Sequence, residues 1–246
     1  MGHPSAAEGP ESASAAATHY PLPRGQERED ARFNAIFATQ DIDTKIRLAA
    51  RFLDDYPLDT RRASVFEVLV NSYCEKQDWP HFYATTDRAL ESYPQDVEIL
   101  ALAGWVIPHQ FDPNVPDAAL KLERAERYEK RAMELIPSMP MPANITPDKF
   151  AAAKSATLAR AHSGLGLVYF REGNWAPSVT ELQAATQSGA SAEQSDLFAL
   201  AVGLEKLNRY AEAALQYDRC SLTPGALQNA FKEAAGKTRS QIAHPN

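Results

Sequence analysis

The pair His162-Ser163 is the place in this sequence that first suggests catalysis, because a histidine can activate a serine hydroxyl as a nucleophile. The residues around the pair predict a helix, and successive residues of a helix point about 100° apart. The imidazole therefore cannot easily reach the neighbouring hydroxyl. His162 also stands where a large packing residue is expected, so we interpret it as a core histidine.

Other residues whose types could take part in catalysis or ligand binding also lack the pattern that this chemistry needs. Gly164-Leu165-Gly166 follows no predicted strand and lacks the third glycine of a dinucleotide-binding loop. The sequence contains no HExxH, P-loop or G-x-S-x-G motif, and its six histidines share no helical face. Cys74 and Cys220 lie far apart on apolar helical faces, which favours buried thiols over a disulfide or metal ligands. We therefore expect no catalysis, no cofactor and no metal site.

Composition excludes several classes of partner. The 246 residues carry a formal net charge of −7 and form no basic stripe with aromatic residues, so nucleic acid is not an expected partner. No apolar run approaches the roughly 20 residues that span a bilayer. Met1–Gly25 has no hydrophobic centre and thus no sign of a secretion signal. We expect a cytoplasmic protein, with an exported protein whose leader has been removed as the alternative.

The elements that hold these residues are helices. From Leu158 to Ala190 two runs of apolar residues recur at helical spacing, and Gly173-Asn174 separates them at a position suited to a left-handed turn. Gly166 lies inside the first helix, where glycine costs roughly 1 kcal/mol relative to alanine. We interpret Gly166 as a point where the partner helix approaches closely.

This unit recurs along the chain. A shift of about 35 residues places Tyr169 on Leu204 and Trp175 on Tyr210. Residues of similar kinds occupy the same offsets upstream, at Phe66, Leu69, Tyr73, Trp79, Ala89 and Pro94. The pattern resembles the tetratricopeptide repeat (TPR) family over about Glu27 to Thr223. The resemblance implies an all-α superhelix of helical hairpins, closed by a C-terminal capping helix.

Three regions follow from this interpretation. Residues 1–26 are of low complexity and are expected to be disordered, residues 27–223 hold about five helix pairs, and residues 224–246 form the capping helix and tail. Proline-rich insertions interrupt the pairs near 107–116 and 137–147. We expect Ile107–Pro116 to be irregular and exposed. The charged helix that begins at Asp117 is interpreted as solvated surface.

The resemblance also implies a function. In TPR proteins the first helix of each pair lines a concave groove that binds a peptide or a partner helix. The candidate partner-binding residues here are Glu67, Asn71, Glu98, Trp105, Arg160, Ser163, Arg171, Phe198 and Glu205. Trp105 and Phe198 are the expected anchors, because aromatic side chains carry a large share of interface energy. Arg160 and Arg171 are expected to pair with acidic groups of the partner, and Glu67 and Glu98 with basic ones.

We therefore predict a non-catalytic scaffold that binds a protein or peptide partner. Some TPR proteins hold a terminal carboxylate with a Lys/Asn/Arg clamp, but only Asn71 fits that pattern, so binding of chaperone tails is not predicted. The alternative is a structural or assembly factor that self-associates or works in the cell envelope. The sequence leaves the oligomeric state open.

Overall fold

The computed structural model describes residues 24–143, 145–187 and 193–243, so most of the segment expected to be disordered lies outside the described residues. Within these ranges the chain forms eleven α-helices, one 3-10 helix and no strand, which confirms the all-α prediction. The α-helices are α1 Arg24–Ala38, α2 Ile42–Asp55, α3 Arg62–Glu75, α4 Trp79–Ser92, α5 Val97–His109, α6 Ala118–Leu135, α7 Pro147–Arg171, α8 Trp175–Gln187, α9 Gln194–Lys206, α10 Tyr210–Cys220 and α11 Gln228–Ala243, and the 3-10 helix η1 is Ile136–Ser138.

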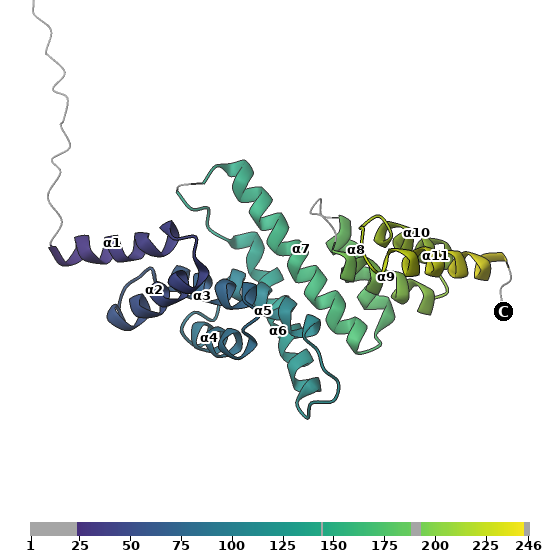
Figure 1. Cartoon of the computed structure of the whole chain (residues 1–246), viewed down its shortest axis with the longest axis horizontal. Helices are drawn as coiled ribbons and strands as arrows, with labels where there is room; N and C mark the ends of the chain where they lie inside the picture. The colour runs from purple at the N-terminus through teal and green to yellow at the C-terminus, as the bar shows by residue number, and fades with distance from the viewer. Residues whose placement is uncertain (1–23, 144, 188–192, 244–246) are drawn as a thin grey trace, which may run out of the picture.

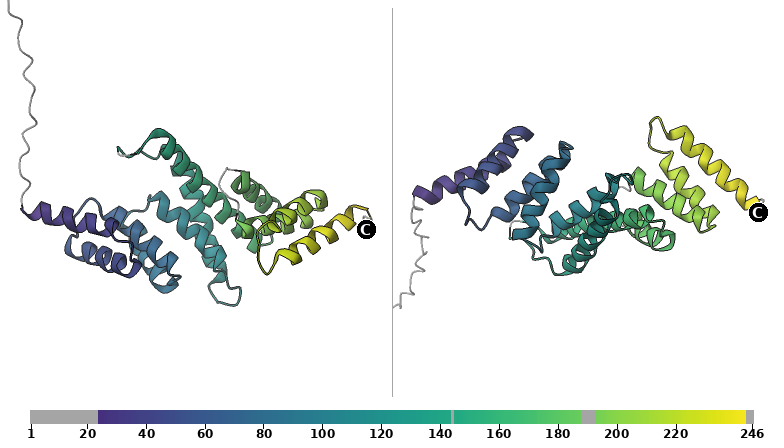
Figure 2. Two further views of the ribbon diagram at one scale, coloured as in Figure 1. Left: turned by 45° about the horizontal axis from the view of Figure 1, so that its top comes forward. Right: turned by 90° about the horizontal axis from the view of Figure 1, so that it is seen from below.

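The helices form successive antiparallel hairpins along one long axis (Figures 1 and 2). The hairpins are α1–α2, α3–α4, α5–α6, α7–α8 and α9–α10, and α11 packs on the last of them. The long helix α7 crosses the middle of the molecule, between the N-terminal helices and α8 to α11. Among the helices of the described ranges, none combines the length and the apolar character that crossing a membrane requires.

The turn inside a hairpin has the same backbone geometry in three places. A residue with positive φ ends the first helix, and the next N–H donates to a carbonyl five residues earlier, which is the Schellman arrangement. These hydrogen bonds run from Asp78 to Tyr73, from Asn174 to Tyr169 and from Arg209 to Leu204, at 2.9, 2.8 and 2.9 Å. The left-handed residues are Gln77, Gly173 and Asn208. The turn predicted at Gly173-Asn174 is confirmed, and the repeat is present in the backbone as well as in the sequence.

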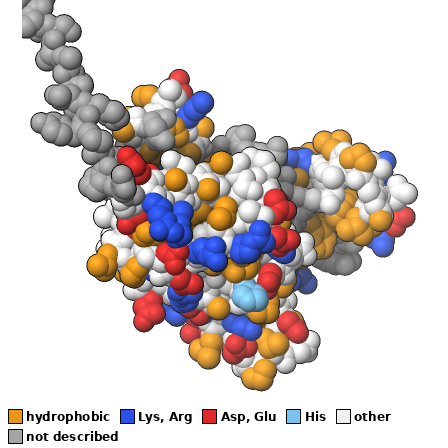
Figure 3. Space-filling view, turned by 60° about the vertical axis from the view of Figure 1, so that its left-hand side comes forward, with side chains coloured by type: hydrophobic (Ala, Val, Ile, Leu, Met, Phe, Trp, Pro, Cys, Tyr) orange, Lys and Arg blue, Asp and Glu red, His pale blue; other side chains and the backbone are white. Residues whose placement is uncertain are grey.

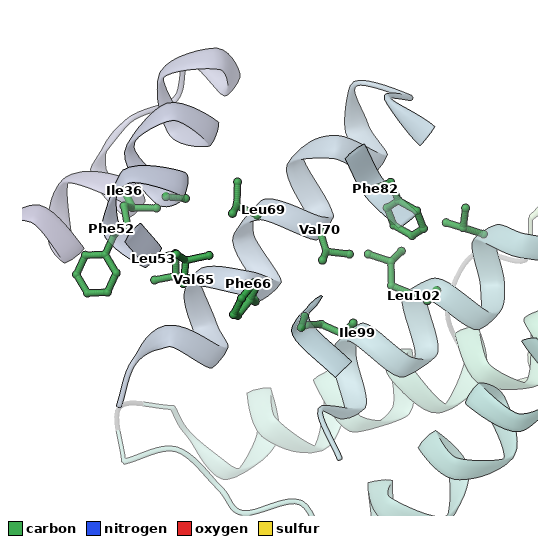
Figure 4. Packing of buried hydrophobic residues seen from close by; sticks show 14 residues of the cluster. Ile36, Phe52, Leu53, Val65, Phe66, Leu69, Val70, Phe82, Ile99 and Leu102 are labelled. Atoms are coloured by element: carbon green, nitrogen blue, oxygen red, sulfur yellow. The ribbon is translucent and has the colours of Figure 1, made fainter. Parts of the chain in front are cut away.

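The N-terminal half, α1 to α5, and the C-terminal half, α7 to α11, have separate hydrophobic cores. In the N-terminal half, α3 places Val65, Leu69 and Val70 between the side chains of α2 and those of α4 and α5 (Figure 4). In the C-terminal half, Leu182 and Leu204 belong to one buried cluster. A further cluster joins α9, α10 and α11. Because each hairpin packs on its neighbours, burial accumulates from one unit to the next.

The mid-helix glycine of α7 has the role that its position predicts. A Cβ atom added to Gly166 would lie 2.7 Å from Cγ of Leu182 and 3.0 Å from the backbone nitrogen of the same residue. Real Cβ atoms do not approach other atoms so closely, so α7 and α8 can meet here only without a side chain. The interpretation of Gly166 as a close-packing residue is confirmed.

The expectation that Ile107–Pro116 is irregular and exposed is wrong for its first part. Helix α5 continues to His109, and Ile107 and Pro108 are both buried. Phe111 is half-buried and packs against a cluster that includes Val168 of α7. Pro108 lies in the last turn of α5, so the one intrahelical hydrogen bond that its missing N–H removes is at the end of the helix. The segment is exposed at Gln110, at Asp112–Asn114 and at Pro116.

Two further expectations about burial need correction. The charged helix α6 is not solvated surface throughout, because Glu129 has no exposed area at all. Cys74 and Cys220 are both free thiols, but only Cys220 is buried, and Cys74 is half-buried.

Candidate protein-binding groove

A groove of about 610 Å³ lies between α1 and α3, and the side chain of Lys45 on α2 also lines it. Its lining includes the apolar Phe33, Phe37 and Val68, the acidic Glu67 and Glu75, and the polar Asn71. Phe37 is 48% exposed, although it contacts Phe33 with a ring separation of 4.9 Å. The groove thus offers an aromatic surface beside two carboxyl groups. It brings together two of the predicted site residues, Glu67 and Asn71.

Acidic side chains gather where α3 meets the start of α5. Glu67 of α3 is hydrogen-bonded to Asp96, which caps the N-terminus of α5 through the backbone N–H of Ile99 (3.1 Å). Burial, together with the negative charges of Asp96 and Glu98, raises the pKa of Glu67 to about 7. Burial also raises the pKa of Asp96. The two carboxyl groups therefore share a proton near neutral pH, which lets them lie close together.

Glu98 and Arg160 form an internal pair that joins α5 to α7. The guanidinium Nη1 of Arg160 lies 3.6 Å from Oε2 of Glu98, and the hydroxyl of Thr157 donates to the other carboxylate oxygen at 2.8 Å. Both partners of the ion pair keep about a third of their side-chain area exposed, 37% and 36%. These two predicted site residues satisfy each other, and a partner that used one of them would compete with the other.

In the middle of the chain Trp105 and Ser163 lie in different environments. Trp105 is half-buried, and its ring stands 4.1 Å from that of His109, whose Nδ1 donates to the Trp105 carbonyl at 2.7 Å. Ser163 is buried, and its hydroxyl donates to Asp196 of α9 at 2.8 Å. Burial raises the pKa of Asp196 to about 6, although the bond from Ser163 opposes that rise. Ser163 thus supports the contact between α7 and α9 and does not reach the surface.

At the C-terminal end Phe198 and Glu205 both belong to the contact of α9 with α10 and α11. Phe198 is 42% exposed, and its ring lies 6.3 Å from Tyr217 and 6.0 Å from Phe231. The carboxylate of Glu205 accepts hydrogen bonds from the hydroxyls of Tyr217 (3.0 Å) and Thr238. Phe198 thus keeps exposed area, whereas Glu205 mainly holds the capping helix in place.

The remaining predicted residues have local roles. Asn71 is exposed and donates to the carbonyl of Glu67 one turn earlier, at 2.8 Å. Arg171 donates to the carbonyl of Pro108 at 3.1 Å and lies over the ring of Phe111, so it holds the end of α5. His162 is not a plain core residue, because its Nδ1 lies 2.7 Å from a carboxylate oxygen of Glu181.

Charges of both signs are mixed on the face of the molecule that Figure 3 shows. On the face that Figure 3 turns toward the viewer, acidic and basic side chains lie side by side among apolar ones. Ion pairs in the N-terminal half include Arg61–Asp30, at 2.5 Å, and Lys76–Asp43. The described residues contain no group of three or more His, Cys, Asp or Glu placed to hold a metal ion.

Sequence reasoning missed three acidic residues, Asp96, Glu129 and Asp196, that the fold places in or beside the helix contacts. Asp96 directly precedes an apolar helical run, so its capping role was open to prediction from the sequence. Its contact with Glu67 was not, because the two residues come from different hairpins. The environments of Glu129 and Asp196 depend in the same way on helices distant in sequence.

The fold is that of a tetratricopeptide-like helical-repeat protein. The chain resembles the crystal structure of a thermophilic TPR protein from Thermus thermophilus, with a TM-score of 0.50 and 16% sequence identity. The match covers 87% of this chain and 98% of the other. No family model matches the sequence, and no curated protein matches it either. The resemblance shows the fold alone.

Proposed function

We propose that this chain is a non-catalytic interaction scaffold that binds a protein segment along the face formed by α1, α3, α5, α7 and α9. The observation that carries the proposal is the groove between α1 and α3, where exposed aromatic surface lies beside carboxyl groups. Aromatic side chains in a groove contribute much of the energy of an interface, and charges beside them select the partner.

The chemistry of the groove indicates a partner segment that carries a basic residue next to an apolar one. Phe33 and Phe37 offer apolar contact, and Glu67 and Glu75 offer carboxylates within the same groove. Lys45 is the one basic residue in its lining, so acidic groups outnumber basic ones there. A lysine or arginine of the partner would take the place of the proton that Glu67 and Asp96 share.

Farther along the same face we propose Trp105 and Phe198 as apolar contacts. Both keep exposed area while they pack against neighbouring aromatic rings, which holds them rigid before a partner arrives. A rigid side chain loses little conformational entropy on binding. Arg160 would contact the partner only in exchange for its bond to Glu98.

A selection from random peptides displayed on phage tests the proposal. Peptides with lysine or arginine beside an aromatic residue should be enriched, and Glu67→Gln and Phe37→Ala should weaken their binding while the melting curve stays unchanged. Arg127→Glu, an exposed change on α6, is the matched control and should leave binding intact. Binding that persists in both groove variants, or that is lost in the α6 variant, contradicts the proposed site.

The alternative of a self-associating assembly factor also has an observation in its favour. Apolar side chains are exposed on α10, on α11 and in the loop between them, at Leu215 (59%), Leu222 (77%), Leu227 (58%) and Ile242 (51%). Clusters of exposed apolar residues often mark contacts between proteins. Sedimentation across a range of concentrations decides between the two functions, because a dimer that dissociates on Leu222→Asp favours assembly.

A further inference from the structure

Glu129 of α6 occupies a position that the next hairpin fills with leucine. Leu182 of α8 packs against Gly166 of α7, and Glu129 packs in the same way against Gly104 of α5. A Cβ atom added to Gly104 would lie 2.5 Å from the carboxyl carbon of Glu129. The repeat therefore places a carboxylic acid where its neighbouring unit places a hydrocarbon side chain.

The carboxyl group of Glu129 is completely enclosed. Its side chain has no exposed area, and neither oxygen has a hydrogen-bond partner among the described residues. Gly104 of α5 encloses it on one side and Gly164 of α7 on the other, so the lack of two side chains provides the space that it fills. An ionised carboxylate in this place would cost several kcal/mol.

Burial raises the pKa of Glu129 well above its usual range, and the positive charge of Arg160 opposes the rise. Most of the other ionisable groups that α5, α6 and α7 bring near the junction have partners of their own, whereas the buried Nε2 of His109 has no hydrogen-bond partner within the described ranges. Glu98 holds Arg160, His109 donates to the Trp105 carbonyl, His162 lies against Glu181, and Glu126 pairs with Lys130 at 2.7 Å. Glu129 is therefore held as the neutral acid.

The junction of α5, α6 and α7 connects the two halves of the molecule (Figure 1). Its apolar contacts are two small clusters, one around Ala101, Ala132 and Ala161 and the other around Ala125 and Val168. Small side chains let the three helices approach closely. A charge that forms between the clusters thus acts on the contact that fixes one half of the solenoid relative to the other.

We propose that Glu129 makes the α5–α6–α7 junction a proton-dependent joint between the two halves of the solenoid. While the carboxyl keeps its proton, α6 packs tightly between the two glycines. When the proton passes to solvent, the carboxylate must reach water, so α6 separates from α5 and α7. The population of the open junction then rises about tenfold for each pH unit, as long as the closed form is protonated and the open form is not.

Hydrogen exchange measured by mass spectrometry tests this joint in the full chain. Exchange in α6 and central α7 is compared between the wild type and Glu129→Gln at each pH from about 6 to about 9, which cancels the intrinsic pH dependence of exchange. The ratio of the exchange rate in the wild type to that in Glu129→Gln should rise up to tenfold per pH unit in these helices and stay constant in α2 and α10. A constant ratio in α6, or an equal rise in all helices, overturns the proposal.

Two further variants complete the test. Glu129→Leu copies the residue of the next hairpin and should remove the pH dependence as Glu129→Gln does. It takes the place of Glu129→Gln as the reference if that variant does not fold. Glu123→Gln, an exposed acid on the same helix, should behave as the wild type. In addition, the side-chain carboxyl ¹³C signal of Glu129, assigned by its loss in the variant, should be that of a protonated acid at about pH 7. A pKa of Glu129 near 4.5, the ordinary value for glutamate, in the intact fold would disprove the joint.

Discussion

Gly166 of α7 lies so close to Leu182 of α8 that a Cβ atom on the glycine would stand 2.7 Å from Cγ of the leucine. We expect Gly166→Leu to lower the free energy of unfolding by about 1–3 kcal/mol or more, because the added side chain would overpack the interface. Urea denaturation followed by circular dichroism measures the change.

Gly236 provides the matched control for that substitution. It also lies inside a helix, α11, but a Cβ atom there would meet nothing within 4 Å. Gly236→Ala should therefore stabilise the protein by up to about 1 kcal/mol through helix propensity alone. If Gly166→Leu also raised the midpoint, the close contact between α7 and α8 would be excluded.

The buried pair of Ser163 and Asp196 gives a second prediction. Removing the hydroxyl by Ser163→Ala leaves the Asp196 carboxylate without its donor, which should cost about 1–3 kcal/mol at pH 8. Below about pH 4 the carboxyl is protonated in both states, and the loss should be smaller. Thr180→Ala, an exposed hydroxyl on α8, serves as the control. An equal loss at both pH values would mean that the charge of Asp196 is not involved.

Asp196 should also make the stability of the folded protein depend on pH. Its pKa is raised from 3.8 to about 6 in the folded protein. Between these values the native state holds a proton that the unfolded chain has lost, so its contribution to stability falls as pH rises. Asp196→Asn should remove this dependence, which denaturation curves at about pH 4 and pH 7 would show. A pH profile equal to that of the wild type would contradict the assignment.

Groove binding should depend on pH through the pair of Glu67 and Asp96. Because the pKa of Glu67 is about 7, raising the pH through this value adds negative charge to the α3–α5 contact. The affinity for a peptide with lysine or arginine should then increase, whereas Glu67→Gln should bind more weakly and without that increase. Fluorescence anisotropy with a selected peptide measures both. An affinity that falls as pH rises would contradict a cationic partner.

Limited proteolysis should distinguish the two proline-rich connections. Cleavage is expected in the exposed residues 140–143 between η1 and α7, and not after Ile107, because that residue is buried in the last turn of α5. Mass spectrometry of the first fragments locates the cut. A first cut at Ile107 would show that the end of α5 opens more readily than the connection before α7.

Much of the fold could be predicted from the sequence because it rests on local rules. The spacing of Leu158, Leu165 and Tyr169 indicates helix periodicity, and Gly173 indicates the left-handed turn that a helix end needs. Both depend on residues a few positions apart. Repetition then made the local signals reinforce each other, so the helical hairpins and the close-packing role of Gly166 followed without any tertiary information.

The candidate site could be predicted only in part. Glu67, Asn71 and Phe198 keep exposed area, as a binding surface requires, but Ser163 is buried and Glu205 is bonded to α10 and α11. The position of a residue in a helix predicts which other side chains lie on the same face of that helix. It does not say whether a helix more than thirty residues away covers that face, as α9 covers Ser163 through Asp196.

Glu129 shows this limit most clearly. In the sequence it is one of several acids on a charged helix, a pattern typical of solvated surface. Only the tertiary structure brings Gly104 and Gly164 against it from two other helices and leaves its carboxyl without a hydrogen-bond partner in the part of the chain that the structure describes. Local sequence determined that α6 is a helix. The packing of α5, α6 and α7 decided the desolvation of Glu129, and with it the protonation state that the junction requires. The residues that meet there lie far apart in the sequence.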